Sequence, residues 1–344
     1  EKEGLIQSHP LQPFSARYRA EPRRGASYAD EWLGSPESDV RPRVFAPAAP
    51  LDREVERIVT LDELSRAFAN PARAFQQALG IAIRTEVSLL GDAEPFALDG
   101  LGKWTVRDAL LARWLEHGER FDSQSCRAEF AARGWLPLGE AGRIAYDAVA
   151  AETAGLVGAV RKVIGDGSPE QRDIDLVVGD WHVRGCVSDV YPRTGFVLAR
   201  AGKLRAKDRL RIWITHLALA AGGNSEAVSH FVGVDKGKAE HVAWGAVDDA
   251  EAELEKFCGL YARMQREALP LLPDLSFEFN ETANKKGDAA AYGKVKANWH
   301  NDKSHADGEK DYAAVMRGRE LFGEDFGQCA KAVFGSIISA ESKA

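Results

Sequence analysis

The sequence predicts an α/β (α+β) protein in which helices flank a mixed sheet, preceded by a helical lead-in and an extended N-terminal arm. Apolar residues recur at helical spacing through most of residues 59–164. Short β-branched segments bounded by turns follow between residues 173 and 200. A helical segment at 206–221 and another strand-like segment complete the order helix, three strands, helix, strand.

The arm covers residues 1–58, where seven prolines exclude long regular elements. The chain starts without methionine and soon reads HPLQPFS, which we interpret as a cut inside a longer protein. Residues 59–135 are expected to form a helical subdomain, and residues 136–344 the α/β domain.

Helix starts are marked by local capping signals. Thr60-Leu-Asp-Glu63 has the form of a capping box, and Asn70-Pro71 caps and begins a second short helix. Thr105 is expected to open a third helix. Two more helices are predicted at 119–133 and about 139–164.

The second half changes to a strand pattern. Strands are predicted at 173–178, 181–190, 196–200, 228–234 and 241–247. Helices are predicted at 206–221, 248–269 and 324–338. The polar stretch 280–312 is expected to be a loop insertion.

Composition limits the function. A net charge of −7 argues against a protein that binds polyanions over its whole surface, so any nucleic-acid contact must come from a local patch. The four cysteines lie far apart, without zinc-ligand spacing, and predict reduced thiols in a cytoplasmic protein. No apolar run reaches membrane-spanning length, and we expect no cofactor.

The stretch Gly185–Arg211 resembles the metal site of PD-(D/E)XK nucleases, in which a G-x-x-D strand is followed by a strand that ends in D-x-K. Here the first pattern reads Gly185-Cys-Val-Ser188, and the second reads Ala199-Arg200-Ala201. The degenerate positions Ser188, Ala199 and Ala201 lack the carboxylates that hold divalent metal in such enzymes. This resemblance implies a nuclease-like fold without a metal site.

A shift of register does not restore the missing acids. Asp189 is adjacent to Ser188, but strand alternation directs it to the other face. In the second strand, a slip reads Leu198-Ala-Arg200 or Arg200-Ala-Gly202. An active magnesium-dependent nuclease nevertheless stays an alternative, as does a pure protein-docking domain.

A basic run follows the second strand. Its members are Arg200, Lys203, Arg205, Lys207, Arg209 and Arg211, against the single acid Asp208. Such a density of cations suits phosphate contacts, although a solvated helix face gives the same pattern. The sequence holds no P-loop motif, so ATP hydrolysis by this chain is not expected.

Several segments together resemble the C-terminal part of RecC, the gamma subunit of exodeoxyribonuclease V. They are His9–Ser15, Tyr28–Trp32, Leu64–Gly80, Glu94–Trp104, Leu136–Gly139, Gly202–Leu217, Trp299, Arg317-Gly318 and Asp325-Phe326. The resemblance implies a non-catalytic domain that helps to split or route DNA strands. It also implies RecB-type and RecD-type partner subunits, with the RecD-type subunit docking on this domain.

Overall fold

The computed structural model describes residues 9–12, 15, 17–20, 50–81, 96–118, 121–223, 227–299 and 309–343. The chain divides into two compact units, residues 1–44 and 45–344. The first unit contains the short helix α1 (Arg17–Ala20). Most of the proposed arm lies outside the described residues.

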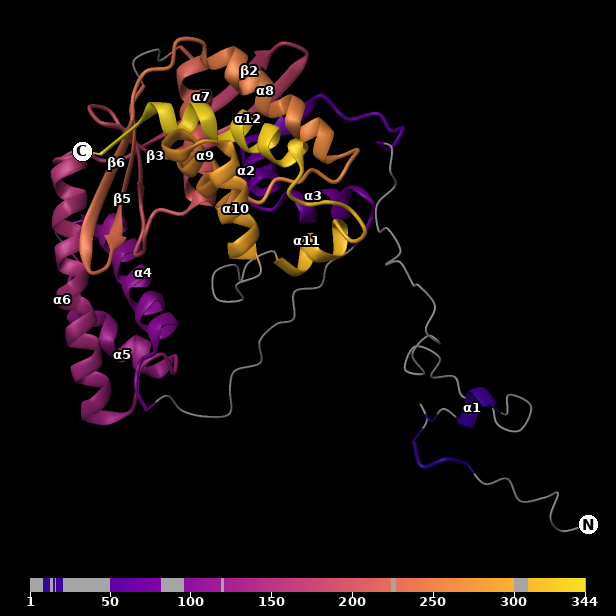
Figure 1. Ribbon diagram of the computed structural model, residues 1–344. Helices are drawn as coiled ribbons and strands as arrows, with labels where there is room; N and C mark the ends of the chain where they lie inside the picture. Colours follow the sequence, from indigo (N-terminus) through magenta and orange to yellow (C-terminus); the bar gives the residue numbers. More distant parts are fainter. Residues whose placement is uncertain are drawn as a thin grey trace, which may run out of the picture. The chain divides into compact units, whose positions relative to one another are not determined.

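The second unit combines a sheet with helices (Figure 1). Its strands are β1 (Ile58–Thr60), β2 (Glu170–Val178), β3 (Trp181–Tyr191), β4 (Gly195–Ala199), β5 (Ser229–Asp235), β6 (Lys238–Trp244) and β7 (Glu341–Lys343). Its helices are α2 (Leu61–Ala69), α3 (Pro71–Ala78), α4 (Gly100–His117), α5 (Gln124–Ala132), α6 (Gly139–Ile164), α7 (Ala206–Ala221), α8 (Ala250–Met264), α9 (Pro273–Lys286), α10 (Asp288–Trp299), α11 (Glu309–Val315) and α12 (Glu324–Ala340).

The strands of the described residues form one mixed sheet in the order β1-β3-β4-β5-β6-β7. Strand β2 lies outside this order and pairs with β3. The pairs β1–β3 and β4–β5 are parallel, whereas the remaining pairs are antiparallel. The predicted order of helix, three strands, helix, strand is observed as α6, β2, β3, β4, α7 and β5. The predicted mixed sheet flanked by helices is therefore confirmed.

Successive residues of a strand contribute alternately to two hydrophobic cores, one on each face of the sheet. Phe196 and Phe231 pack with α7 and α8 in the larger core, whereas their neighbours Val197 and Val232 pack with α6. This alternation follows from the two-residue period of a strand. Figure 1 shows α6 running along β5 and β6, and α7 is buried on the other face of the sheet.

The predicted capping box at Thr60 is confirmed. The backbone N–H of Glu63 donates to Thr60 Oγ1 at 3.1 Å, and the backbone N–H of Thr60 donates to Glu63 Oε2 at 2.8 Å. Asn70 Oδ1 likewise accepts from the backbone N–H of Arg73 at 3.0 Å. These caps begin α2 and α3 at the predicted residues.

Other predicted boundaries are wrong. Helix α4 begins at Gly100 rather than Thr105, because the Asp99 carboxylate accepts from the Gly102 backbone N–H at 2.7 Å and caps it. Helix α5 covers only residues 124–132. Strand β6 covers residues 238–244 rather than 241–247, because it starts directly after the turn at Lys236-Gly237.

The expected loop at 280–312 is also wrong. It contains the end of α9, all of α10 and the start of α11, while residues 300–308 lie outside the described part. Phe279, Ala291, Val295 and Tyr312 are buried in one core with α12, so tertiary packing outweighs the polar composition. In the described residues, no helix combines the length and the apolar character that a membrane span needs.

Candidate functional site

A hollow of about 410 Å³ opens between α2, β3, β4 and the first turns of α7. We call it the α2–α7 hollow. Its basic and hydroxyl side chains are Arg66, Lys207, Arg211, Ser65, Ser188 and Thr215. The hollow therefore includes Ser188 and two members of the predicted basic run.

Ser188 lies on β3, whereas Ala199 ends β4 and Ala201 follows that strand. Ser188 is exposed on β3 and lines the hollow. Ala199 and Ala201 instead pack with the α6 core on the opposite face of the sheet. Leu198 packs with the core on the α7 side, and Arg200 forms an ion pair with Asp208 of α7. The residues of β4 on the α7 side are thus Phe196 and Leu198, Arg200 follows the strand, and none of the three is a carboxylate.

A β-bulge modifies the strand at Ser188. The register of β2 against β3 shifts between Glu170 and Arg172, opposite this position. Asp189 has φ +60°, a left-handed conformation that Asp adopts more readily than most residues. Ser188 Oγ donates to Asp189 Oδ2 at 3.1 Å. Simple alternation therefore does not describe Asp189, since bulges redirect side chains.

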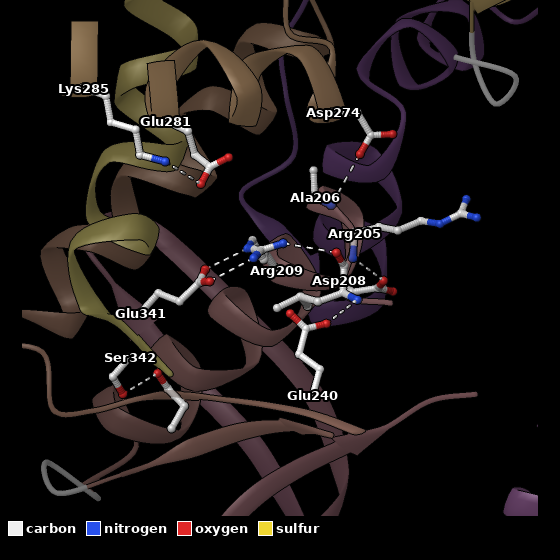
Figure 2. A network of polar contacts seen from close by, with 12 residues as sticks. Arg205, Ala206, Asp208, Arg209, Glu240, Asp274, Glu281, Lys285, Glu341 and Ser342 are labelled. Carbon is white, nitrogen blue, oxygen red and sulfur yellow. Dashed lines mark hydrogen bonds and ion pairs between the residues drawn. The ribbon is translucent and has the colours of Figure 1, made fainter. Parts of the chain in front are cut away.

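Two of the six basic residues point into the protein. Arg200 pairs with Asp208, and the Arg200 side chain is only 22% exposed. Arg209 is buried and pairs with Glu341 through two hydrogen bonds of 2.7 and 2.8 Å (Figure 2). Both guanidinium groups stabilise the fold where α7 begins, which makes them poor contacts for a ligand in solvent.

The other four lie at or near the surface. Lys203, Arg205 and Arg211 are exposed, and Lys207 is half-buried. Figure 2 shows the Arg205 side chain extending away from Asp208 and Arg209. The structure thus brings Lys207 and Arg211 to the hollow, whereas Lys203 and Arg205 lie outside its lining.

The carboxylates around the hollow are already paired with arginines. Asp62 lies 2.7 Å from Arg66, and Asp208 pairs with Arg200 while accepting from the Arg205 backbone N–H at 3.0 Å. Within the described ranges, no group of three or more His, Cys, Asp or Glu residues is placed to hold a metal. The arrangement of cations and hydroxyls instead suits an anionic group.

The contribution of α2 to this site was not predicted from the sequence. Asp62 and Arg66 lie on the side of α2 opposite Leu64 and Phe68, so helical spacing could have predicted their exposure, whereas Ser65 is half-buried between the two sides. Helical spacing could not have shown that α2 packs beside β3 and α7. Cys186, the exposed cysteine in the lining, was also not singled out.

Other proteins resemble this chain. A family model described as the RecC C-terminal domain matches residues 56–284. The chain is 31% identical to RecBCD enzyme subunit RecC of Escherichia coli over 64% of this chain and 19% of that protein. It is 29% identical to the RecC subunit of Mycolicibacterium smegmatis over 80% of this chain and 26% of that protein. The chain thus spans about a fifth to a quarter of these relatives' length. The match over most of its residues shows that the chain belongs to the RecC C-terminal domain family.

Proposed function

We propose that this chain is a non-catalytic, nuclease-like domain of a RecC-type subunit, which works in a complex that processes DNA double-strand ends in the cytoplasm. The observation that carries the proposal is the family match, and the arginine-paired acids that line the hollow support it. In this proposal residues 136–344 form the PD-(D/E)XK-like part, residues 59–135 its helical lead-in and residues 1–58 a linker arm.

The same proposal gives the domain two tasks. It routes or splits DNA strands at a fork, and it docks a RecD-type subunit in a heterotrimer with a RecB-type subunit. The relatives are named as subunits of the RecBCD enzyme, which supports partner subunits of these types. Lys203, Arg205, Lys207 and Arg211 supply surface cations for phosphate contacts that are independent of base sequence.

A cleavage assay tests the non-catalytic assignment. The chain is incubated with single- and double-stranded DNA in Mg²⁺, and no cleavage above the EDTA control is expected. Magnesium-dependent cleavage that Asp189→Ala abolishes would establish the alternative, an active PD-(D/E)XK nuclease. Asp189 is the informative position because it lies beside Ser188 at the bulge.

A pull-down tests the docking task. The chain is immobilised and offered a RecD-type subunit and, separately, a RecB-type subunit. Retention of the RecD-type subunit is expected at physiological salt. Failure to retain it would remove the docking task and leave the strand-routing task to be tested by DNA binding in the assembled complex.

A second candidate is a docking domain without DNA contact. It is favoured by the inward orientation of Arg200 and Arg209, which removes two of the six cations from the surface. Charge reversal at Lys207 and Arg211 in the assembled complex distinguishes the two functions. Unchanged DNA binding supports docking alone, whereas weaker binding supports strand routing.

A further inference from the structure

We propose that the α2–α7 hollow binds the phosphate group of a nucleic-acid strand directly, through cationic side chains and hydroxyls and without a metal ion. The inference deepens the proposed function and rests on it, because it assigns a ligand to the hollow beside Ser188 and the start of α7. The shared chemistry is a phosphate oxyanion, which a DNA backbone, a DNA end or free phosphate can supply.

The cations converge from two helices. Arg66 comes from α2, and Lys207 and Arg211 come from α7. The Arg66–Asp62 pair is 71% and 79% exposed, so it contributes little free energy and Arg66 can exchange its partner. In the part of the chain that the structure describes, Arg211 forms no ion pair. Guanidinium groups bind phosphate oxygens through paired, charge-assisted hydrogen bonds.

Hydroxyl groups add neutral donors to the same wall. Ser65, Ser188 and Thr215 line the hollow. The Ser188 hydroxyl donates to Asp189 Oδ2 at 3.1 Å, so Ser65 and Thr215 are the hydroxyls that remain to serve an anion. Hydroxyl and cationic side chains of these types supply most phosphate contacts in DNA-binding proteins.

The two opposing carboxylates do not cancel this field. Asp208 is paired with Arg200, and Asp62 is paired with Arg66. The lining itself holds three basic side chains, Arg66, Lys207 and Arg211, and two acids, Asp62 and Asp208. In a metal-dependent nuclease the ion offsets the phosphate charge, and here fixed side-chain cations take that place.

The size of the hollow favours a strand over a free anion. Its volume of about 410 Å³ lies within the range of ligand sites, roughly 300–1,000 Å³. A lone phosphate ion is only a few times larger than a water molecule and would leave part of this space empty. A phosphate with its adjoining sugar uses the remainder, including the apolar wall near Val187 and Phe196.

Cys186 provides a direct readout. It lines the hollow and is exposed, whereas Cys126, Cys258 and Cys329 are buried. A neutral maleimide in EDTA measures the alkylation rate of Cys186 by mass spectrometry. The probes are a 5′-phosphorylated oligodeoxynucleotide, the same oligonucleotide without its end phosphate, and inorganic phosphate. Each rate is divided by the rate of the same variant without a probe.

Both oligonucleotides are expected to slow alkylation at least fivefold at saturation, and inorganic phosphate to do so only at far higher concentration. Protection by the phosphorylated oligonucleotide alone assigns the hollow to a strand end, which still supports the proposal. Protection by inorganic phosphate at equal or lower concentration, or no protection, overturns it.

Variants locate the binding. Arg211→Gln is expected to raise the oligonucleotide concentration for half protection about tenfold, and Arg211→Lys to restore part of the loss. The matched control is Lys162→Gln, which removes the same charge from an exposed position on α6, across the sheet. Circular dichroism checks that each variant folds. Equal shifts for Arg211→Gln and Lys162→Gln show a general charge effect and refute a built site.

The same samples separate this inference from the proposed function. Replacing EDTA with Mg²⁺ and scoring the oligonucleotide for cleavage tests catalysis in parallel. Cleavage overturns the non-catalytic assignment even where protection is seen in EDTA. If neither cleavage nor protection is observed, the phosphate site is overturned and the non-catalytic assignment stands.

Discussion

Arg209 and Glu341 form a two-pronged ion pair across 132 residues of sequence. Arg209 Nε donates to Glu341 Oε2 at 2.7 Å, and Nη2 donates to Oε1 at 2.8 Å. The Arg209 guanidinium also lies 4.1 Å from the centre of the Phe277 ring. With side chains only 10% and 14% exposed, the pair ties α7 to β7 (Figure 2).

Removing one partner of this pair leaves a buried charge without compensation. Glu341→Ala is expected to lower the free energy of unfolding by about 3 kcal/mol, measured by urea denaturation. The double variant Arg209→Met/Glu341→Met is expected to be more stable than either single methionine variant. Additive losses in this double-mutant cycle would contradict a coupled pair.

Gly195 is sterically required where β4 begins. It has φ +96°, and a Cβ there would lie 2.0 Å from the Val228 carbonyl oxygen. Gly195→Ala is therefore expected to lower the free energy of unfolding by more than about 2 kcal/mol. The control, Gly155→Ala, lies in the α6 interior with open space around it and should raise stability by roughly 0.5–1 kcal/mol. Equal effects in thermal or urea unfolding would refute the steric argument.

His216 links stability to pH. It is fully buried, its Nδ1 lies 2.9 Å from Ser229 Oγ, and burial lowers its pKa to about 4. Between pH 6.5 and 4 the unfolded chain binds a proton that the folded chain does not, so stability falls as the pH falls. The loss is roughly 3 kcal/mol by pH 4, at 1.36 kcal/mol per pH unit.

The measurement is urea unfolding at pH 7 and at pH 4.5 for the wild-type chain and for His216→Gln. The variant is expected to lose less stability between the two pH values. Some dependence remains, because burial also lowers the pKa values of His230 and His241. An identical loss in both proteins would exclude His216 as the source.

The exposed members of the basic run are expected to contribute to DNA binding, whereas the inward-facing members are not. Replacing Lys203 and Arg205 with Gln in the assembled complex should weaken binding to forked DNA. It should also reduce the slope of log K against log salt by up to about two, one for each lost phosphate contact. Arg200→Gln, whose guanidinium pairs with Asp208, should leave this slope unchanged. Equal slopes for all variants would place the DNA contacts elsewhere.

Local signals predicted local structure well. Thr60 and Asn70 begin their helices as expected, because side-chain capping depends on only a few consecutive residues. The order of strands and helices from α6 to β5 was also predicted. Strands β1 and β7 were missed, because three residues carry too little periodicity to recognise.

The site was harder to predict from the sequence than the order of the elements. Arg209 and Arg211 lie two positions apart, yet one is buried and the other exposed. Because α7 is buried over most of its surface, no polar stripe marks which cation faces solvent. The hollow itself depends on α2, which precedes β3 by more than 100 residues.

Strand β7 also affects how the molecule meets its neighbours. Its three residues pair with Val242, Ala243 and Trp244 of β6 and cover the apolar end of that edge. Unpaired strand edges recruit strands from other molecules and start aggregation. The Arg209–Glu341 pair anchors the first residue of β7. Variants that break this pair are expected to expose the unpaired edge of β6 and to aggregate during refolding before they lose their helices.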